Sequence, residues 1–278
     1  MLKTTLERTD EELKQTFAAL RTPRDVADLL EVEYHDLIFH LYRVPYARKY
    51  VTFEIQKRTG GTRKIEAPSS SLKILQRKLN HVLKCAHTQK PSVHSFLPGR
   101  SIKSNATVHL RRTYVFNVDL IDFFPSINFG RVRGMFKAVP YNLPEKVATV
   151  LAQVCCSQNT LPQGAPTSPM VSNMICAKMD SDLQRLAKQH RCTYTRYADD
   201  ITFWTNRQSF PSEVGRVSKS GEAIPGDGLV GTIRGNGFDI NPGKVRLQKN
   251  DQRQEVTGVI VNRYLNVRRK LSLFLGLI

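Results

Sequence analysis

Alternating apolar and polar residues predict a series of short strands along this chain. In chain order, the alternating or mostly apolar segments are 50–56, 63–67, 114–121, the two halves of 192–204, 255–261 and 265–267. The first two are expected to form a hairpin, because Gly60-Gly61 marks a tight loop between them. The 255–261 segment, which contains Val256-Thr257-Gly258, is expected to be an ordinary strand.

Helices are expected between these strands. The expected helical segments are 69–84, 130–139, 145–156 and 169–187. Thr22, Pro23 and Asp25 are typical of a helix start, and two short helices are expected from there to about Val44. The stretch 206–237 is rich in Gly, Ser and Pro, which predicts a loop with one short helix. Because helices do not regularly follow strands, the order of elements predicts an α+β fold.

The charge of the chain indicates an anionic partner. At 278 residues the chain fits one large domain or two closely packed subdomains, and its formal charge is +18. Such a surface repels itself unless it meets an anion, and nucleic acid is the usual one. A membrane surface is the competing anion, but no apolar run approaches the roughly 20 residues needed to span a bilayer.

Positive charge is concentrated in two parts of the chain. Residues 51–112 contain thirteen Lys or Arg against two acids, and residues 241–270 contain eight against two. A solvated basic face would account for either run alone. Two basic runs on either side of an acidic centre favour an electrostatic channel for a strand of phosphates.

The cysteine pattern is typical of a reducing compartment. The five cysteines, at 85, 155, 156, 176 and 192, form no Cys-x-x-Cys pair, so neither a disulfide framework nor a zinc site is expected. The N-terminus lacks the apolar stretch of a signal peptide. We therefore expect a cytoplasmic protein.

The candidate chemistry lies at four aspartates. Asp199 and Asp200 fall at the predicted tip of a hairpin, while Asp119 and Asp122 come where an apolar strand is expected to end. A solvated acidic turn is one explanation for the adjacent pair. The other is Mg²⁺, a hard cation that takes oxygen ligands and bridges phosphates. Carboxylates from both places could together hold two such ions, which clamp the attacking and leaving oxygens of a phosphoryl transfer.

Three motifs in this order resemble the palm motifs of reverse transcriptases. They are Val118-Asp119-Leu-Ile-Asp122-Phe-Phe124, Leu161-Pro-Gln163-Gly164-Ala-Pro-Thr-Ser168-Pro169 and Tyr197-Ala-Asp199-Asp200. Two more resemble signatures of the retron branch of that family, namely Asn105-Ala106-x-x-His109 and Val256-Thr257-Gly258. The resemblance extends from about residue 50 to residue 270 and implies a right-hand polymerase fold with palm and fingers.

The resemblance implies a role for each matching residue. Asp119, Asp199 and Asp200 would be the catalytic carboxylates that hold two Mg²⁺ ions, and Lys244 would protonate the departing pyrophosphate. The implied nucleotide-binding residues are Lys57, Arg63, Asp122, Phe124, Gln163 and Gly164, with Phe124 as the steric gate against ribonucleotides. The implied retron signature residues, associated with RNA, are Asn105, Ala106, His109, Val256, Thr257 and Gly258. Taken singly, Phe124 is also explained as a core phenylalanine, Lys244 as a solvent lysine and His109 as a core histidine.

The resemblance also divides the chain into segments. It implies an N-terminal helical extension (1–48), fingers (49–113), a palm (114–254, with part of the fingers around 130–160) and a primer-grip hairpin (255–270). An atypical apolar tail at 271–278 stands where the family has a helical thumb, so the thumb is expected to be truncated or missing. Because a thumb holds the template–primer duplex, the activity of this chain alone stays open.

The implied function is that of a retron RNA-directed DNA polymerase. Such an enzyme uses dNTPs to copy part of a structured noncoding RNA into branched single-stranded DNA, in anti-phage defence. The implied partners are that RNA, its cDNA and an effector protein of the same locus. One alternative is another bacterial reverse transcriptase, of the group II intron or diversity-generating type. The other is a polymerase remnant that binds RNA without catalysis.

Overall fold

The computed structural model describes residues 3–56 and 60–267. They form two compact units, each built from separate parts of the chain. The first unit comprises the positions up to Thr88 together with Phe124–Ile175, and the second comprises Gln89–Phe123 together with the positions from Cys176 onward. Lys57, the end of the predicted primer-grip segment and the predicted tail at 271–278 lie outside the described residues.

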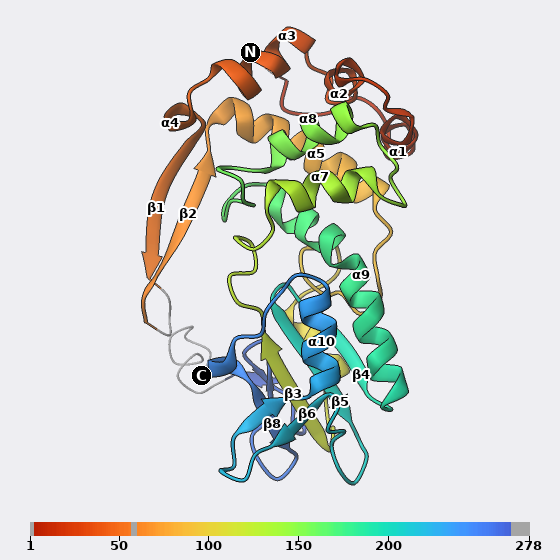
Figure 1. Cartoon of the computed structure of the whole chain (residues 1–278), viewed down its shortest axis with the longest axis vertical. Coiled ribbons are helices and arrows are strands. Elements are labelled where there is room, and N and C mark those ends of the chain that lie inside the picture. Colours follow the sequence, from red (N-terminus) through yellow and green to blue (C-terminus); the bar gives the residue numbers. More distant parts are fainter. Residues whose placement is uncertain (1–2, 57–59, 268–278) are drawn as a thin grey trace. The chain divides into compact units, whose positions relative to one another are not determined.

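The first unit is mainly helical (Figure 1). Its helices are α1 (Asp10–Ala19), α2 (Pro23–Leu29), α3 (Tyr34–Ile38), the π-helical η1 (Phe39–Arg43), α4 (Tyr46–Lys49), α5 (Ser70–Ala86), α7 (Phe129–Lys137) and α8 (Glu145–Cys155). The expected helix start at Thr22 is confirmed, because Thr22 and Asp25 form a capping box. An additional helix, α1, begins with the same device, formed by Thr9 and Glu12.

The first unit also contains a long hairpin. β1 (Tyr50–Gln56) pairs antiparallel with β2 (Thr62–Pro68), as the alternation of residues predicts. Gly60 and Gly61 in the connecting loop have φ values of 89° and 76°, a conformation that glycine adopts without steric cost.

The second unit is organised around a four-stranded antiparallel sheet (Figure 1). The strand order is β4 (Thr193–Tyr197), β5 (Asp200–Thr205), β3 (Tyr114–Asp119) and β8 (Arg246–Lys249). β3 lies between β5 and β8, and its apolar side chains, among them Val115, Phe116 and Val118, are buried. The expected buried strand at 114–121 is therefore confirmed, although it ends two residues earlier.

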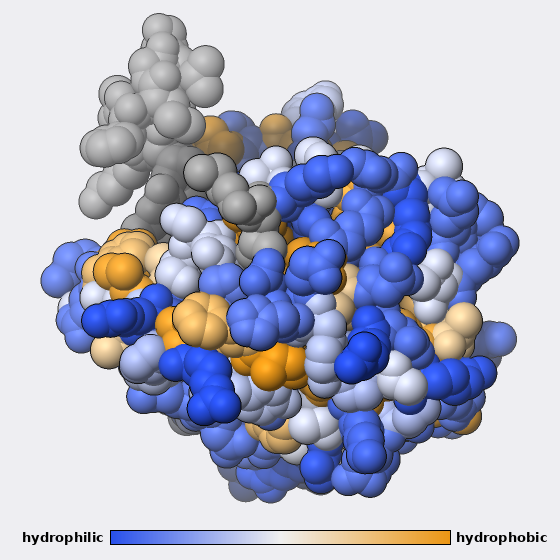
Figure 2. Space-filling model, turned by 90° about the horizontal axis from the view of Figure 1, so that it is seen from above, coloured by the Kyte–Doolittle hydropathy of each residue, from blue (hydrophilic) through white to orange (hydrophobic). Residues whose placement is uncertain are grey.

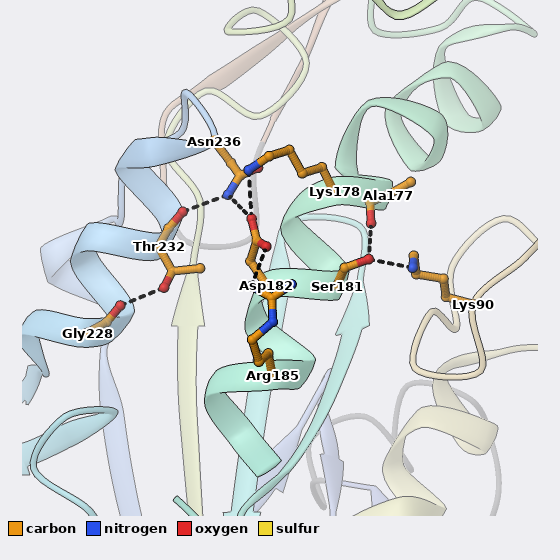
Figure 3. Close-up of polar contacts among 9 residues, drawn as sticks. All are labelled: Lys90, Ala177, Lys178, Ser181, Asp182, Arg185, Gly228, Thr232 and Asn236. Carbon is orange, nitrogen blue, oxygen red and sulfur yellow. Dashed lines mark hydrogen bonds and ion pairs between the residues drawn. The ribbon is translucent and has the colours of Figure 1, made fainter. Parts of the chain in front are cut away.

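Two helices lie side by side against this sheet in Figure 1, α9 (Ser168–Gln189) and α10 (Asp227–Gly235). Asn236, which follows α10, donates through Nδ2 to Asp182 on α9 at 3.1 Å (Figure 3). Lys178 donates to the same carboxylate at 2.9 Å and is the main reason that the pKa of Asp182 is lowered. From a different segment, Lys90 donates to Ser181 at 2.6 Å (Figure 3). These contacts join α10 and the segment before β3 to α9.

The stretch 206–237 contains more regular structure than its composition predicts. Besides the expected short helix, α10, it forms a small antiparallel hairpin of β6 (Gly215–Val217) and β7 (Ala223–Pro225). Three-residue strands leave little alternation to detect, which is why the sequence pattern indicated only a loop.

The expected strand at 255–261 is wrong. β9 (Glu255–Val256) and β10 (Val259–Ile260) pair antiparallel around a tight turn at Thr257-Gly258, and β11 (Asn266–Val267) pairs with β10. Thr257 and Gly258 have φ values of 48° and 81°. Positive φ at both central residues is the requirement of a type I′ turn, which matches the twist of a hairpin.

The surface drawn in Figure 2 is mostly hydrophilic, with small apolar patches between polar residues. Within the described ranges, none of the helices has both the length and the apolar character to cross a bilayer. Cys155, Cys176 and Cys192 are buried.

Gly226, just before α10, packs against the backbone. A Cβ at this position would lie 2.2 Å from Ser212 O and 2.3 Å from Glu213 C. Gly226→Ala is therefore expected to lower the free energy of unfolding by about 2 kcal/mol or more. Gly231→Ala on α10, where a Cβ meets nothing within 4 Å, is the matched control and should raise it by up to about 1 kcal/mol. Urea unfolding compares the two, and equal stabilities would contradict this packing.

Candidate active site

The hairpin of β4 and β5 carries two aspartates at its tip. Tyr197 pairs with Asp200, so Ala198 and Asp199 are the turn residues. This register confirms the expected hairpin tip. Ala198 has a φ of 56°, in the left-handed region that residues other than glycine rarely adopt. Such a conformation persists only where the surroundings hold it in place.

Asp119 reaches the same edge of the sheet from β3. It pairs with Asp200 across the β3–β5 ladder, and residues directly opposite one another present their side chains to the same face. The next residue, Leu120, donates its N–H to the carbonyl oxygen of Asp199 at 3.1 Å. The structure therefore brings Asp119 to the adjacent pair Asp199 and Asp200, from which it is far apart in the sequence.

Lys244 joins this cluster from a short 3₁₀ turn, η2 (Pro242–Lys244). The side chain of Asn241 accepts the N–H of Gly243 at 3.2 Å, and the N–H of Asn241 donates to the carbonyl oxygen of Asp119 at 2.7 Å. With the turn held in this way, Lys244 Nζ donates to Asp119 Oδ1 at 2.8 Å. A lysine that is directed only to solvent would not make this contact, so the alternative explanation of Lys244 as a solvent lysine does not fit.

Negative charge is crowded at this edge of the sheet. Burial raises the pKa of Asp200 to about 7, and the neighbouring carboxylates of Asp199 and Asp119 contribute to the rise. Lys244 and Arg246 oppose it, but only in part. Additional positive charge at this place would therefore favour the ionised form of Asp200.

The donor set fits a hard divalent cation. Carboxylate oxygens are the ligands that such cations prefer, and Asp119, Asp199 and Asp200 supply them from two adjacent strands and the turn between β4 and β5. The side chain of Asp119 is only 9% exposed, so its negative charge is costly to bury without a compensating cation. These three carboxylates are the groups at this edge that could hold such a cation.

Most of the predicted nucleotide-binding residues that the structure describes lie in the first unit, whereas Asp122 lies in the second. Arg63 lies on β2. Farther along that strand, Glu66 donates its N–H to the carbonyl oxygen of Gln163 at 2.7 Å. Gly164 has a φ of 121°, and a Cβ there would lie 2.9 Å from Ile65 Cγ2. The structure thus brings the Gln163-Gly164 loop onto the strand that carries Arg63, with no room for a Cβ at 164.

Phe123 and Phe124 have different surroundings. Phe123, in the second unit, is 4% exposed and stacks on Phe238 with ring centroids 5.7 Å apart. Phe124, in the first unit, is half-buried, and Asp122 is exposed with a φ of 43°. Of the two adjacent rings, Phe123 is the core residue, so Phe124 remains the candidate for the steric gate.

The two predicted retron signatures contact each other. Asn105 on α6 (Ile102–Val108) donates through Nδ2 to Thr257 Oγ1 at 3.3 Å. Ala106 and Val256 belong to one buried apolar cluster. The signatures therefore join α6 to the turn between β9 and β10, and the positive φ of Gly258 allows that turn to form.

His109 follows α6 and is fully buried. Its Nε2 lies 2.6 Å from Thr195 Oγ1 on β4, within hydrogen-bond distance. Burial lowers the pKa of His109 to about 3, so the ring is neutral at physiological pH. His109 is therefore a core histidine. Its partner, Thr195, lies on β4, the strand that leads to Asp199 and Asp200.

A buried ion pair next to the hairpin tip was not foreseen from the sequence. Arg196 on β4 donates through Nε and Nη2 to both oxygens of Asp180 on α9, at 2.7 and 2.8 Å. The two side chains are 0% and 1% exposed. The alternation of β4 is the sequence signal that could have found this pair, because it places Arg196 on the same face as Tyr194. A guanidinium group on a buried face requires a charged partner, which predicts a carboxylate.

Comparisons with known proteins agree with these motifs. Residues 55–261 match the family model described as Reverse transcriptase (RNA-dependent DNA polymerase). The Retron Mx65 reverse transcriptase of Myxococcus xanthus is 36% identical over 270 residues, a match that covers 90% of this chain and 60% of that protein. The Retron Ec86 reverse transcriptase of Escherichia coli is 32% identical over 238 residues, covering 86% of this chain and 70% of that protein. The chain therefore spans only part of the length of these relatives.

Among solved structures, a telomerase from Candida albicans in complex with a fragment of telomeric RNA aligns with a TM-score of 0.53 at 10% identity. The alignment covers 79% of this chain and 46% of that chain. At this low identity the alignment is evidence for the fold alone. It confirms the predicted α+β polymerase fold. The chain belongs to the reverse transcriptase family and, within it, to the retron reverse transcriptases.

The Asp200→Asn variant, studied in metal-free buffer, tests whether the negative charge of Asp200 destabilises the folded chain. Because the folded-state pKa of about 7 lies above the ordinary 3.8, ionising Asp200 costs folding free energy as the pH rises between these values, and the cost persists above pH 7. At pH 8 the variant should be more stable than the natural chain by a few kcal/mol, at about 1.4 kcal/mol per pKa unit. The gap should shrink towards pH 4.5.

Thermal unfolding with EDTA at both pH values measures this gap. Asp182→Asn is the control of opposite sign, because the pKa of Asp182 is lowered and its ionised form stabilises the fold. Asp182→Asn should therefore lose stability at pH 8. A gap for Asp200→Asn that does not change with pH would contradict the electrostatic description.

Proposed function

We propose that this protein is the RNA-directed DNA polymerase of a retron. The observation that carries the proposal is the convergence of Asp119, Asp199 and Asp200 at one edge of the four-stranded sheet, with Lys244 in contact with Asp119. A polymerase centre requires this arrangement, and a solvated acidic turn does not need a third carboxylate from another strand. Membership of the retron reverse transcriptases supports the same conclusion.

The proposed reaction joins a primer hydroxyl to the α-phosphate of a dNTP and releases pyrophosphate. Two Mg²⁺ ions, when bound, would activate the hydroxyl and neutralise the charge on the phosphates. Asp119 and Asp199 would hold the ions, and Asp200 would add negative charge beside them. Lys244 carries a proton at Nζ and donates it to the departing pyrophosphate. Its position 2.8 Å from Asp119 supports this role, because it keeps the ammonium group at the reacting end of the sheet.

The nucleotide is proposed to be bound by residues carried over from the family resemblance. Lys57 and Arg63 contact the triphosphate, as basic side chains commonly do. Asp122 presents its backbone to the triphosphate, and Gln163 lies beside the nucleotide. The backbone of Gly164 allows close approach, which its φ of 121° and lack of space for a Cβ support. Phe124 packs beneath the sugar and leaves no room for a 2′-hydroxyl.

The template is proposed to be a structured noncoding RNA from the same locus. Priming would start from the 2′-hydroxyl of a guanosine in that RNA and leave a branched RNA–DNA product. The formal charge of +18 supports binding to a polyanion, and the telomerase with the matching fold is itself in complex with RNA. An effector protein of the same locus and a role in anti-phage defence complete the proposal.

The segments of the chain keep the functions that the resemblance implies. Residues 1–48 form the N-terminal extension, 49–113 the fingers, 114–254 the palm with part of the fingers, and 255–270 the primer grip. The turn at Thr257-Gly258 supports the last assignment, because a primer grip is a hairpin and the type I′ turn forms one. The described part of this segment ends at residue 267.

Asp199→Asn is expected to abolish synthesis without loss of RNA. The purified chain with its copurifying RNA, Mg²⁺ and labelled dNTPs should extend a primer, and Asp199→Asn should reduce extension by about 10²-fold or more. Asp227→Asn on α10, an aspartate whose side chain is 88% exposed, is the matched control and should extend normally. Stable RNA binding by the natural chain without any extension would favour the alternative, an RNA-binding remnant.

Phe124→Ala is expected to admit ribonucleotides. Without the ring, the space beneath the sugar accommodates a 2′-hydroxyl, so the ratio of kcat/KM for dNTP over rNTP should fall by about tenfold or more. The control is Phe123→Leu, because Phe123 packs in the core and a shape change there should leave the ratio unaltered. An unchanged ratio in Phe124→Ala, with normal dNTP incorporation, would remove Phe124 from the nucleotide site.

A further inference from the structure

The buried pair of Arg196 and Asp180 is costly for the fold. Both side chains are withdrawn from water, and each buried charge carries a desolvation penalty that a bidentate contact only partly repays. Tyr194 adds a third donor, with its hydroxyl 2.6 Å from Asp180 Oδ1. Replacing these buried polar side chains with apolar side chains of similar volume often leaves the stability of a fold unchanged or raises it. Stability alone therefore does not account for the presence of a guanidinium group here.

Besides its contact with Asp180, Arg196 hydrogen-bonds to the backbone of the turn, which an apolar side chain cannot do. Its Nη1 donates to the carbonyl oxygen of Ala198 at 3.1 Å. Ala198 is the turn residue with a φ of 56°, and its carbonyl belongs to the peptide group that leads into Asp199. The planar guanidinium thus joins a helix, through Asp180, to the peptide before a candidate metal-binding carboxylate.

Arg196 is itself fixed by the backbone on both sides. It pairs with Ile201 of β5 on one side. On the other side its N–H donates to Ser92 O at 2.8 Å, and its carbonyl accepts the N–H of His94 at 2.9 Å. These contacts hold the backbone of Arg196, and the bidentate contact with Asp180 orients its side chain toward the turn. Sites supported by such rigid elements keep their geometry precisely.

We propose that Arg196, oriented by Asp180, is a positioning residue that holds the Ala198–Asp199 peptide so that Asp199 reaches a bound divalent ion. This inference rests on the proposed polymerase function and adds to it a residue that does not touch substrate. Arg196 acts through the turn, because its own side chain is fully buried and the carbonyl of Ala198 is its link to Asp199. Lysine offers one nitrogen in place of the planar fork and does not satisfy both Asp180 and Ala198.

The first test is Arg196→Lys, compared with Tyr194→Phe. Arg196→Lys keeps a cation beside Asp180 but gives up the link to the turn, so kcat should fall by about 10- to 100-fold, the effect of a displacement of about 1 Å at a reacting group. The KM for dNTP should stay within a few-fold, and the Mg²⁺ concentration for half-maximal activity should rise. Tyr194→Phe removes a hydrogen bond to Asp180 without touching the turn, so it should keep both kcat and the Mg²⁺ dependence.

A second variant separates positioning from folding. Asp180→Leu/Arg196→Met in the Tyr194→Phe background replaces the whole buried set with apolar side chains, a change that folds tolerate. It should unfold near the temperature of Tyr194→Phe and still show the loss of kcat and the raised Mg²⁺ requirement. Activity within threefold of Tyr194→Phe, in either this variant or Arg196→Lys, would overturn the proposal.

Failure of the proposed function is recognised separately. If the natural chain shows no extension, Mn²⁺ binding to the natural chain and to Arg196→Lys is compared by calorimetry. Weaker binding by Arg196→Lys supports the positioning role without catalysis. Equal binding by the two proteins overturns it.

Discussion

The register between β3 and β5 is the constraint on which the rest of the site depends. Asp119 faces Asp200 because Phe116 pairs with Phe203 and Val118 with Ile201. These four apolar side chains are buried, so the hydrophobic pattern of the two strands determines how they align. A slip by one residue would turn Asp119 to the opposite face of the sheet and remove it from the pair at the hairpin tip.

The aligned strands hold like charges together, and the surrounding residues offset only part of the repulsion. Lys244 contacts Asp119, and both Lys244 and Arg246 lower the pKa of Asp200, yet burial and the other carboxylates still raise it to about 7. Apolar packing thus supports an arrangement that electrostatics opposes. Such a conflict between local interactions and the fold is typical of a functional site. A divalent cation has the charge and ligand preference to relieve it.

Much of this arrangement can be predicted from the sequence, because it depends on local patterns. The alternation of apolar and polar residues predicts the β1–β2 hairpin and the two strands around Asp199. The helical spacing of Leu72, Leu75 and Leu79 predicts α5. The turn at Thr257-Gly258 was missed, since apolar residues on both sides hide a reversal of the chain. The pairing of Arg196 with Asp180 was also missed, because it joins a strand to a helix and no periodicity reports which helix packs there.

The most direct test of the shared carboxylate centre is the anomalous diffraction of crystals grown with Mn²⁺ in place of Mg²⁺. Anomalous peaks within coordination distance of carboxylate oxygens from both Asp119 and Asp199 are the expected result. Asp119 and Asp199 lie on different segments, so a shared ion requires the convergence described here. Ordered metal bound elsewhere, with Asp119 still paired only to Lys244, would contradict it.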